Sequence, residues 1–275
     1  MPIKTAHEAP IQILDSVAEI TDYSYALVHL FESHPEYLFF FKNQLEAGRE
    51  VILDNSIFEL GTAFDRDRYA YWINKLRPTE YIIPDSLEDV IETKAMASNW
   101  IEDYGHLNDY SKSIGVVQGR TYYEIVECYD YLDNVVNVDK IAISFDYSYY
   151  LRNSNIGFLK LDKSAKLAGW MLGRISLMER LLADGVINKD KPHHLLGCSL
   201  PQEFKHYVGE KWDWIESMDS SNPVVAGLQL KHYDDYRGLS DKPSIKLFEL
   251  IDVEVSPEQW RSIALNISNF RQNLR

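Results

Sequence analysis

The chain has 275 residues, a formal net charge of −14 and 45% hydrophobic residues. This length fits one large α/β barrel or two smaller domains. No apolar run reaches the roughly 18 residues of a membrane-spanning helix, and residues 1–10 lack the charged-then-apolar pattern of a signal peptide. We therefore expect a cytoplasmic protein that does not contact a membrane. The acidic excess argues against the broad basic face of a protein that grips nucleic acid nonspecifically.

The two cysteines, Cys128 and Cys198, are too few for a disulfide framework and lack the paired spacing of metal ligands. Cys128 falls in a helical pattern, which predicts a buried thiol. A zinc site built on cysteines is excluded, and nothing in the sequence calls for a metal or a cofactor.

Short β-branched or aromatic runs alternate along the chain with amphipathic stretches of ten or more residues. The predicted strands are Tyr25–His29, Val51–Asp54, Tyr81–Pro84, Ile114–Val117, Lys140–Ile143, His194–Leu196 and Trp214–Glu216, with Ile245–Leu250 as an eighth strand or an elaboration. The predicted helices are a stretch from Pro35 to Arg49, then Asp65–Leu76, Leu87–Tyr104, Tyr122–Asp133 with Thr121 as its N-cap, Lys163–Asp184, one that starts at Pro201, and Pro257–Asn273.

About eight strands that alternate with helices predict parallel strands joined by right-handed crossovers. A (β/α)8 TIM-type barrel is the favoured α/β fold, as a single domain over residues 1–275 without a zinc subdomain. A doubly wound open sheet is the alternative. The barrel is favoured because polar residues follow almost every predicted strand, and in a barrel the carboxyl ends of the strands converge on one face.

The polar residues that follow the predicted strands include Asp54, Asp85, Gln118, Ser144 and Asp219. Any one of them alone is also typical of a helix N-cap or a turn. Aspartates that are gathered into one pocket differ in protonation, because mutual repulsion and burial raise some of their pKa values. Such a set supplies an acid, a base and a nucleophile, which suits cleavage of a glycosidic bond.

Two further residues suit a flat heterocyclic ligand. Phe58 follows Asp54 by four residues and either stacks on such a ring or belongs to the core. The amide of Gln118 offers both a donor and an acceptor to the edge of a heterocycle.

Six ordered segments resemble the tRNA-guanine transglycosylase superfamily, and most closely its short phage and bacterial branch, the 7-deazaguanine DNA transglycosylases. The segments are LDNSIFELG (Leu53–Gly61), IIPD (Ile82–Asp85), GVVQGR (Gly115–Arg120), AISF (Ala142–Phe145), HLLGCSLPQEF (His194–Phe204) and ESMDSSNP (Glu216–Pro223). GVVQG is the most specific of them, and the resemblance runs from about Leu53 to Pro223.

The resemblance implies a role for each matching residue. It makes Asp219 the nucleophile that bonds to the sugar carbon and Asp54 the general acid/base. The residues that it implies for binding the base are Gly119, Phe58 by packing, Asp85 and Gln118 by reading the purine edge, and Ser144 and Phe145 through backbone groups.

The implied enzyme is a pentosyltransferase that exchanges guanine in DNA for a 7-deazaguanine such as 7-cyano-7-deazaguanine. Its implied partners are that base and a single-stranded or flipped-out guanine, since a base in a duplex is out of reach. The chain departs from the tRNA-acting members, because it lacks their cysteine-rich zinc site and has Ser56 and Ile57 in place of a glycine-rich turn. The missing zinc site favours DNA and leaves the oligomeric state open.

The sequence is also compatible with three other functions: the same exchange on tRNA, a barrel hydrolase or glycosidase acting on a small molecule, and an inactive base-binding protein. Two groups of aromatic residues are also open. Tyr147, Tyr149 and Tyr150 either stack on neighbouring bases or pack their loop down. His193 and His194, at the start of a predicted strand, have either a structural or a phosphate-contacting role.

Overall fold

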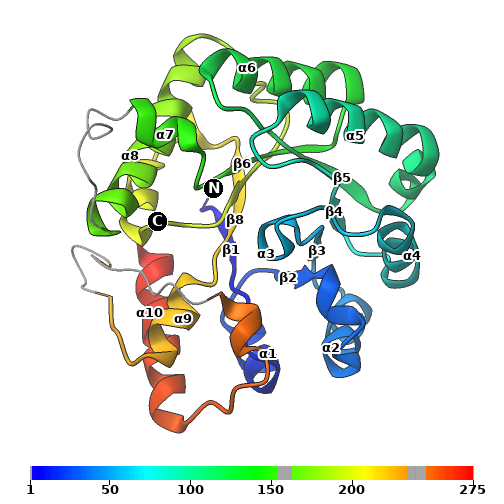
Figure 1. Ribbon diagram of the computed structural model, residues 1–275. Helices are drawn as coiled ribbons and strands as arrows, with labels where there is room; N and C mark the ends of the chain where they lie inside the picture. The colour runs from blue at the N-terminus through cyan, green and yellow to red at the C-terminus, as the bar shows by residue number, and fades with distance from the viewer. Residues whose placement is uncertain (1, 154–162, 234–238, 240–245, 275) are drawn as a thin grey trace. The chain divides into compact units, whose positions relative to one another are not determined.

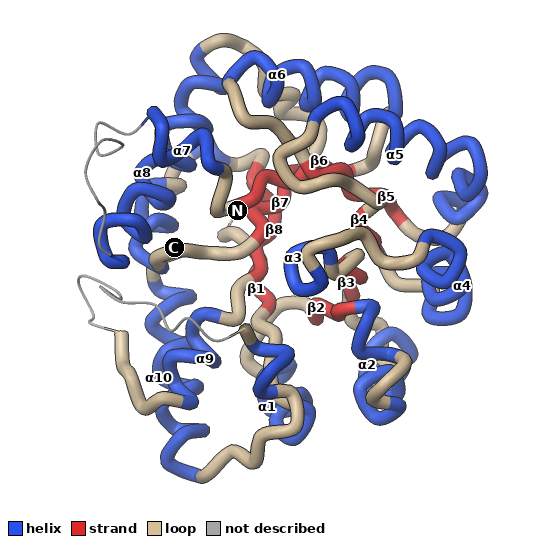
Figure 2. The backbone as a smooth tube through the Cα atoms, in the orientation of Figure 1, coloured by secondary structure: helices blue, strands red, loops and turns tan. Residues whose placement is uncertain are grey.

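The computed structural model describes residues 2–153, 163–233, 239 and 246–274. Eight parallel strands form one sheet in the order β1-β8-β7-β6-β5-β4-β3-β2 (Figure 2). The strands are β1 Lys4–Ala6, β2 Ser24–Leu27, β3 Val51–Asp54, β4 Glu80–Ile82, β5 Lys112–Val116, β6 Lys140–Ser144, β7 His193–Leu196 and β8 Ile215–Asp219. From β2 to β8, strands that follow one another in the chain are neighbours in the sheet, and β1 pairs with β8. Helices lie between the strands along the chain. This is the arrangement of a (β/α)8 TIM-type barrel, and the predicted fold class is confirmed.

The helices are α1 Leu14–Glu19, α2 Pro35–Glu46, α3 Ile57–Leu60, α4 Arg66–Leu76, α5 Val90–Tyr104, α6 Tyr122–Asp130, α7 Ser148–Asn153, α8 Lys163–Ala183, α9 Asn222–Leu228 and α10 Pro257–Gln272 (Figure 1). Short 3₁₀ segments lie at Ile11–Ile13, Val28–Phe31, Gly105–Asp109, Pro201–His206, Glu210–Trp212 and Leu247–Leu250, and a π-helix at Tyr131–Val136. None of the helices in the described part of the chain is both long and apolar enough to cross a bilayer.

The predicted strands and the observed strands agree except at the two ends of the chain. The seven predicted strands up to Glu216 correspond to β2–β8, and β3 has the predicted bounds. Of the two alternatives for Ile245–Leu250, the eighth strand is wrong, because Leu247–Leu250 forms a 3₁₀ turn; residue 245 lies outside the described residues. The remaining strand is β1, whose three residues are too few for a recognisable alternation of polar and apolar side chains.

Two predicted helices take a different helical form. The prediction for Tyr122–Asp133 holds to Asp130, after which the chain continues as the π-helix. The helix expected at Pro201 is a 3₁₀ helix. The predicted N-cap is confirmed: Thr121 forms a capping box with Glu124, in which each side chain accepts a hydrogen bond from the other residue's backbone N–H.

Contacts divide the chain into two compact units. The first unit comprises residues 1–22, 144–187 and 195–275, and the second comprises residues 23–143 and 188–194. The expectation of a single domain stays a prediction.

Glycine residues allow helices of the first unit to pack closely against each other. α9 lies along α10 (Figure 1), and a Cβ added to Gly227 would meet Ile263 at 2.5 Å. α7 lies against α8, where a Cβ on Gly173 would meet that of Tyr150 at 2.2 Å. Tyr147, Tyr149 and Tyr150 are all buried, and the rings of Tyr147 and Tyr150 are 5.2 Å apart. These tyrosines therefore pack their segment down, as one of the two interpretations predicted.

Buried aromatic and histidine side chains line the interior of the second unit. His194 is fully buried and its ring stacks on Tyr25, with the centroids 6.1 Å apart. His193 is also fully buried and bonds through Nε2 to the hydroxyl of Tyr129 at 2.8 Å. Burial of both rings supports the structural role and excludes contact with a phosphate at the surface.

Candidate functional site

In the second unit, Asp54 is the last residue of β3, and two donors hold its carboxylate. The Tyr25 hydroxyl donates to Oδ2 at 2.5 Å, and the backbone N–H of Ser56 donates to Oδ1 at 2.5 Å. The second bond requires a tight turn, and Ser56 has a left-handed φ of 61°. Hydrogen bonds to a charged acceptor are the stronger ones, so the carboxylate of Asp54 is fixed in orientation at the strand end.

Asp85 follows β4 and receives one hydrogen bond on each carboxylate oxygen. Asn55 Nδ2 donates to Oδ1 at 2.7 Å, and Gln118 Nε2 donates to Oδ2 at 2.7 Å. Each amide is fixed in turn, because Asn55 also donates to the carbonyl of Ile83 at 3.1 Å and Gln118 Oε1 accepts from the N–H of Glu88 at 2.8 Å. The three side chains come from the ends of β3, β4 and β5, which are neighbours in the sheet.

The environment of Asp85 perturbs its ionisation. Only 1% of the residue is exposed, and this burial raises its pKa from 3.8 to about 6, although the hydrogen bonds from Asn55 and Gln118 act in the opposite direction. Carboxyls with strongly perturbed pKa values are typical of functional sites. At neutral pH the Asp85 carboxylate is thus mostly ionised and accepts hydrogen bonds. It becomes protonated at a pH only slightly below neutral.

Gly119 allows the chain to turn directly from β5 into α6. A Cβ at this position would lie 2.8 Å from the backbone nitrogen of Ile125 and 2.9 Å from the Cβ of Glu124. Only a residue without a side chain fits there, so Gly119 sets the approach of Gln118 to the strand end. The GVVQG segment therefore needs a glycine at position 119 for steric reasons, and its Gln118 side chain bonds to Asp85.

Phe58 lies on the short helix α3 and is 41% exposed. The alternative that Phe58 is a core aromatic is therefore wrong. Its packing on a bound base stays a prediction.

In the first unit, Asp219 is the last residue of β8 and is 5% exposed. Its Oδ1 accepts a hydrogen bond from the backbone N–H of Gly197 at 3.2 Å. Gly197 follows β7, and its φ of 62° is in the left-handed region that favours glycine. The Asp219 carboxylate is thus fixed through one oxygen by a backbone donor.

Phe145 and Ser144 lie at the end of β6, also in the first unit. The Phe145 ring covers Gly197, where an added Cβ would meet Cδ1 at 2.3 Å, and it packs edge-on against Trp170. The N–H of Ser144 donates to the Tyr147 hydroxyl at 3.2 Å, and its carbonyl accepts from the Tyr150 hydroxyl at 2.9 Å. A base that uses the backbone of Ser144 would compete with these two hydroxyls.

The structure therefore groups the predicted residues by unit. Asp54, Phe58, Asp85, Gln118 and Gly119 belong to the second unit, and Ser144, Phe145 and Asp219 to the first.

Four residues near these carboxylates had no role in the sequence predictions: Tyr25, Asn55, Gly197 and His7. Asn55 stands directly after Asp54, and this polar pair at a strand end was the available signal. His7 follows β1, is 5% exposed and bonds through Nδ1 to the carbonyl of Ser220 at 2.7 Å. Burial lowers its pKa to about 4, so the ring is neutral and Nδ1 is the donor.

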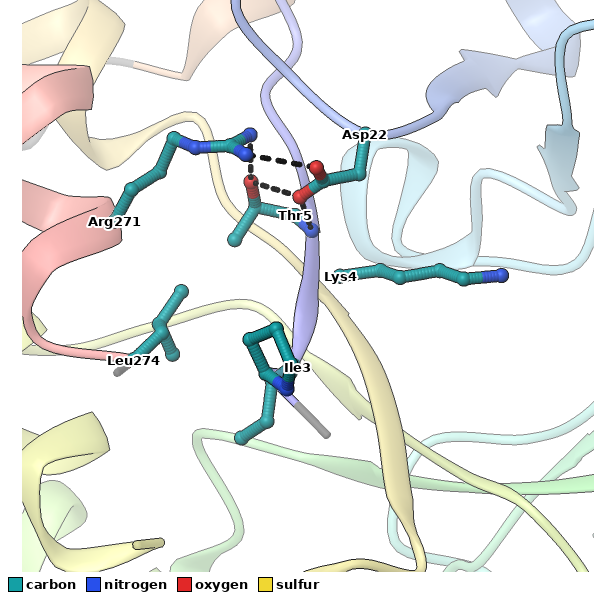
Figure 3. A pocket seen from close by; sticks show the side chains of 7 residues that line it. Ile3, Lys4, Thr5, Asp22, Arg271 and Leu274 are labelled. Atoms are coloured by element: carbon teal, nitrogen blue, oxygen red, sulfur yellow. Dashed lines mark hydrogen bonds and ion pairs between the residues drawn. The ribbon is translucent and has the colours of Figure 1, made fainter.

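A hollow of about 160 Å³ lies at the amino end of β1 in the first unit (Figure 3). There Arg271 of α10 bonds to Asp22 at 2.8 Å and to the Thr5 hydroxyl at 3.2 Å. Thr5 also donates to Asp22, through its backbone N–H at 2.8 Å. This network ties the last helix to the first strand, and the charges of Arg271 and Asp22 neutralise each other.

No protein-family model and no curated protein matches the chain. Within the described ranges, no group of three or more His, Cys, Asp or Glu side chains is placed to hold a metal ion. Fixed carboxylates at strand ends can accept hydrogen bonds from a ligand, move a proton and attack an electrophilic carbon.

Proposed function

We propose that the protein is a guanine transglycosylase, which replaces guanine in DNA with a 7-deazaguanine such as 7-cyano-7-deazaguanine. One observation carries most of this proposal: the buried carboxylate of Asp85 is held between the amides of Asn55 and Gln118. The positions of the motifs support it as well, because the segments that resemble the tRNA-guanine transglycosylase superfamily all lie at or next to strand ends.

Asp85 suits the edge of guanine because that edge presents two neighbouring donors, the ring N1–H and the exocyclic amino group. An ionised carboxylate accepts both, whereas adenine offers a ring acceptor in place of the N1–H, and this acceptor would be buried against the carboxylate without a donor. A buried acceptor that loses its partner costs about 1–3 kcal/mol, which is sufficient for selection. Gln118 is fixed beside it to bind a further edge atom.

In the proposed reaction Asp219 attacks C1′ of the sugar, and the bond from C1′ to N9 of guanine breaks. The electron pair goes to guanine, which takes a proton from the protonated form of Asp54 as it leaves, and Asp54 becomes a carboxylate. The carboxylate of Asp54 then removes the N9 proton of the 7-deazaguanine, whose N9 attacks C1′ and releases Asp219. Two inversions give net retention, and no bond energy beyond that of the glycosidic bond is consumed.

The hydrogen bonds on the two aspartates suit these roles. The Gly197 N–H donates to Oδ1 of Asp219, and this bond orients the carboxylate that is proposed to attack. Asp54 is held by Tyr25 and Ser56 in a half-buried position, from which a proton can be given and regained.

DNA is the proposed polymer, because the chain has only two cysteines and so lacks the cysteine-rich zinc site of the tRNA-acting branch. The test is incorporation of radiolabelled guanine or 7-cyano-7-deazaguanine into DNA and, in parallel, into tRNA. We expect label in DNA, and a covalent protein–DNA adduct that survives denaturation and disappears in Asp219→Ala. Asp190→Asn, at an exposed carboxylate, is the control and keeps both. Label in tRNA alone, or an adduct that persists in Asp219→Ala, would refute the proposal.

The formal net charge of −14 favours a second candidate, a barrel glycosidase that acts on a small neutral molecule. The same two carboxylates would serve that reaction, with water in place of the incoming base. Release of free sugar from small glycosides, with no label in either nucleic acid, would identify it.

A further inference from the structure

A fully buried ion pair lies next to the turn that contacts Asp219 in the first unit. Arg174 of α8 and Glu203 of the following 3₁₀ helix have side chains that are both 0% exposed. Arg174 Nε donates to Glu203 Oε1 at 2.6 Å, and its second terminal nitrogen donates to Oε2 at 3.1 Å. The Tyr207 hydroxyl donates to the same carboxylate at 2.8 Å. The charges are therefore paired and the carboxylate is well supplied with donors.

Arg174 also donates to the backbone at the end of β7. One terminal nitrogen donates to the carbonyl of Leu196 at 2.8 Å and the other to that of Gly197 at 3.0 Å. The guanidinium is rigid and planar, so it fixes both carbonyls relative to α8. The Leu196 carbonyl and the Gly197 N–H belong to the same peptide unit, so Arg174 holds this unit at its carbonyl.

The other side of the same turn is held by Phe145, whose ring leaves no room for a Cβ on Gly197. Between these two constraints, the Gly197 N–H points at Asp219 Oδ1, 3.2 Å away. The chain of contacts runs from Arg174 through one peptide unit to the carboxylate of Asp219.

Stability alone does not account for a charge at this position. Arg174 lies on the buried stripe of α8, seven residues after Leu167 and seven before Leu181, both of which are buried. A buried ion pair is often no more stabilising than apolar side chains of the same volume. An apolar residue here would fill the space but could not bind two carbonyls, which favours a role in setting the geometry of the turn.

We propose that Arg174, supported by Glu203, is a positioning residue for Asp219. It holds the Leu196–Gly197 turn so that the Gly197 N–H fixes Oδ1 and thereby orients the Asp219 carboxylate toward the sugar carbon. This inference rests on the proposed function of Asp219 as the nucleophile. Misplacement of a reacting group by about 1 Å costs on the order of 100-fold in rate, and that sets the size of the expected effect.

The kinetic test compares Arg174→Lys and Glu203→Gln with the control Arg180→Lys, which is at an exposed position on the same helix. Lysine keeps the charge but cannot bind two carbonyls and a carboxylate in one plane. We expect kcat for base exchange to fall about 10- to 100-fold in Arg174→Lys, with KM for DNA within twofold of wild type and the control unchanged. Added guanidinium should restore part of the activity of Arg174→Ala. A folded Arg174→Lys protein with wild-type kcat would overturn the proposal.

A second measurement needs no activity, and its outcome is independent of the proposed function. In protein labelled with ¹⁵N-glycine, which has 13 glycines, the Gly197 amide resonance should shift in Asp219→Asn. The same resonance should shift in Glu203→Gln, which keeps the volume of the pair and is the milder change if Arg174 variants do not fold. A Gly197 resonance that is unchanged in Glu203→Gln would show that the ion pair does not control the turn. If wild type lacks base exchange altogether while these shifts occur, the proposed function fails and the control of Asp219 by the ion pair stands.

Discussion

The raised pKa of Asp85 makes a quantitative prediction about stability and pH. Its pKa is 3.8 in an ordinary environment and about 6 in the folded protein. The folded state therefore holds this proton more tightly than the unfolded chain does. Stability from this group is fully present at low pH and is lost as the pH rises through 6. One pKa unit corresponds to about 1.4 kcal/mol, so the whole effect is about 3 kcal/mol.

Asp85→Asn removes the titration and isolates its contribution. Between pH 5 and pH 8 the free energy of unfolding of wild type, relative to the variant, should fall by about 1.4 kcal/mol. Absolute stability is less informative. The Asn side chain has one acceptor for the two amide donors that now bind Asp85, and the unsatisfied donor costs about 1–3 kcal/mol at every pH.

The assay is urea denaturation, followed by tryptophan fluorescence at pH 5, 6, 7 and 8, for wild type and Asp85→Asn. Glu102→Gln removes one carboxylate from an exposed position of α5 in the same unit and serves as the control; its difference from wild type should not follow the Asp85 profile. A wild-type minus Asp85→Asn difference that is flat, or that rises with pH, would refute the assignment of a raised pKa to Asp85.

Three further predictions concern Tyr25, Gly119 and the two cysteines. Tyr25→Phe removes the hydroxyl that donates to Asp54, and loss of a bond to a charged group, about 1.5–3 kcal/mol, should lower kcat for base exchange about 10- to 100-fold. Gly119→Ala places a Cβ against the backbone of α6, and such overpacking should cost about 1–3 kcal/mol in urea denaturation. Cys128 and Cys198 are fully buried, and burial raises the pKa of Cys128 to about 12, so a thiol reagent at pH 8 should label neither in the folded protein and both in urea.

Each of these predictions has a matched control or a contrary outcome. Tyr71→Phe alters an exposed tyrosine and should leave kcat unchanged. In Gly105→Ala the new Cβ meets only Ile101, at 3.5 Å, and stability should change little; equal losses in the two alanine variants would contradict the steric reasoning. Rapid labelling of either thiol in the folded protein would contradict its burial.

Local signals in the sequence determined most of the elements and their order. β3 has the predicted bounds because a run of apolar residues that ends in Asp54 is read from neighbours alone. Thr121 caps α6 as predicted because a capping box involves residues only three apart. Alternation of such elements about eight times predicted parallel strands with helical crossovers, and the polar residues at the strand ends favoured the barrel over an open sheet. The polar residues at the strand ends were visible for the same reason.

The tertiary structure decided what depends on residues far apart in the chain. β1 is a strand because it pairs with β8, with Ala6 opposite Asp219, and three residues carry no pattern of their own. Tyr25 acquires a role only when β2 and β3 bring its hydroxyl to Asp54, and Arg174 only when α8 meets the turn after β7. The sequence alone determined which residues stand at strand ends. The fold decided which donors fix each carboxylate, because hydrogen-bond partners and burial arise only when distant segments pack together.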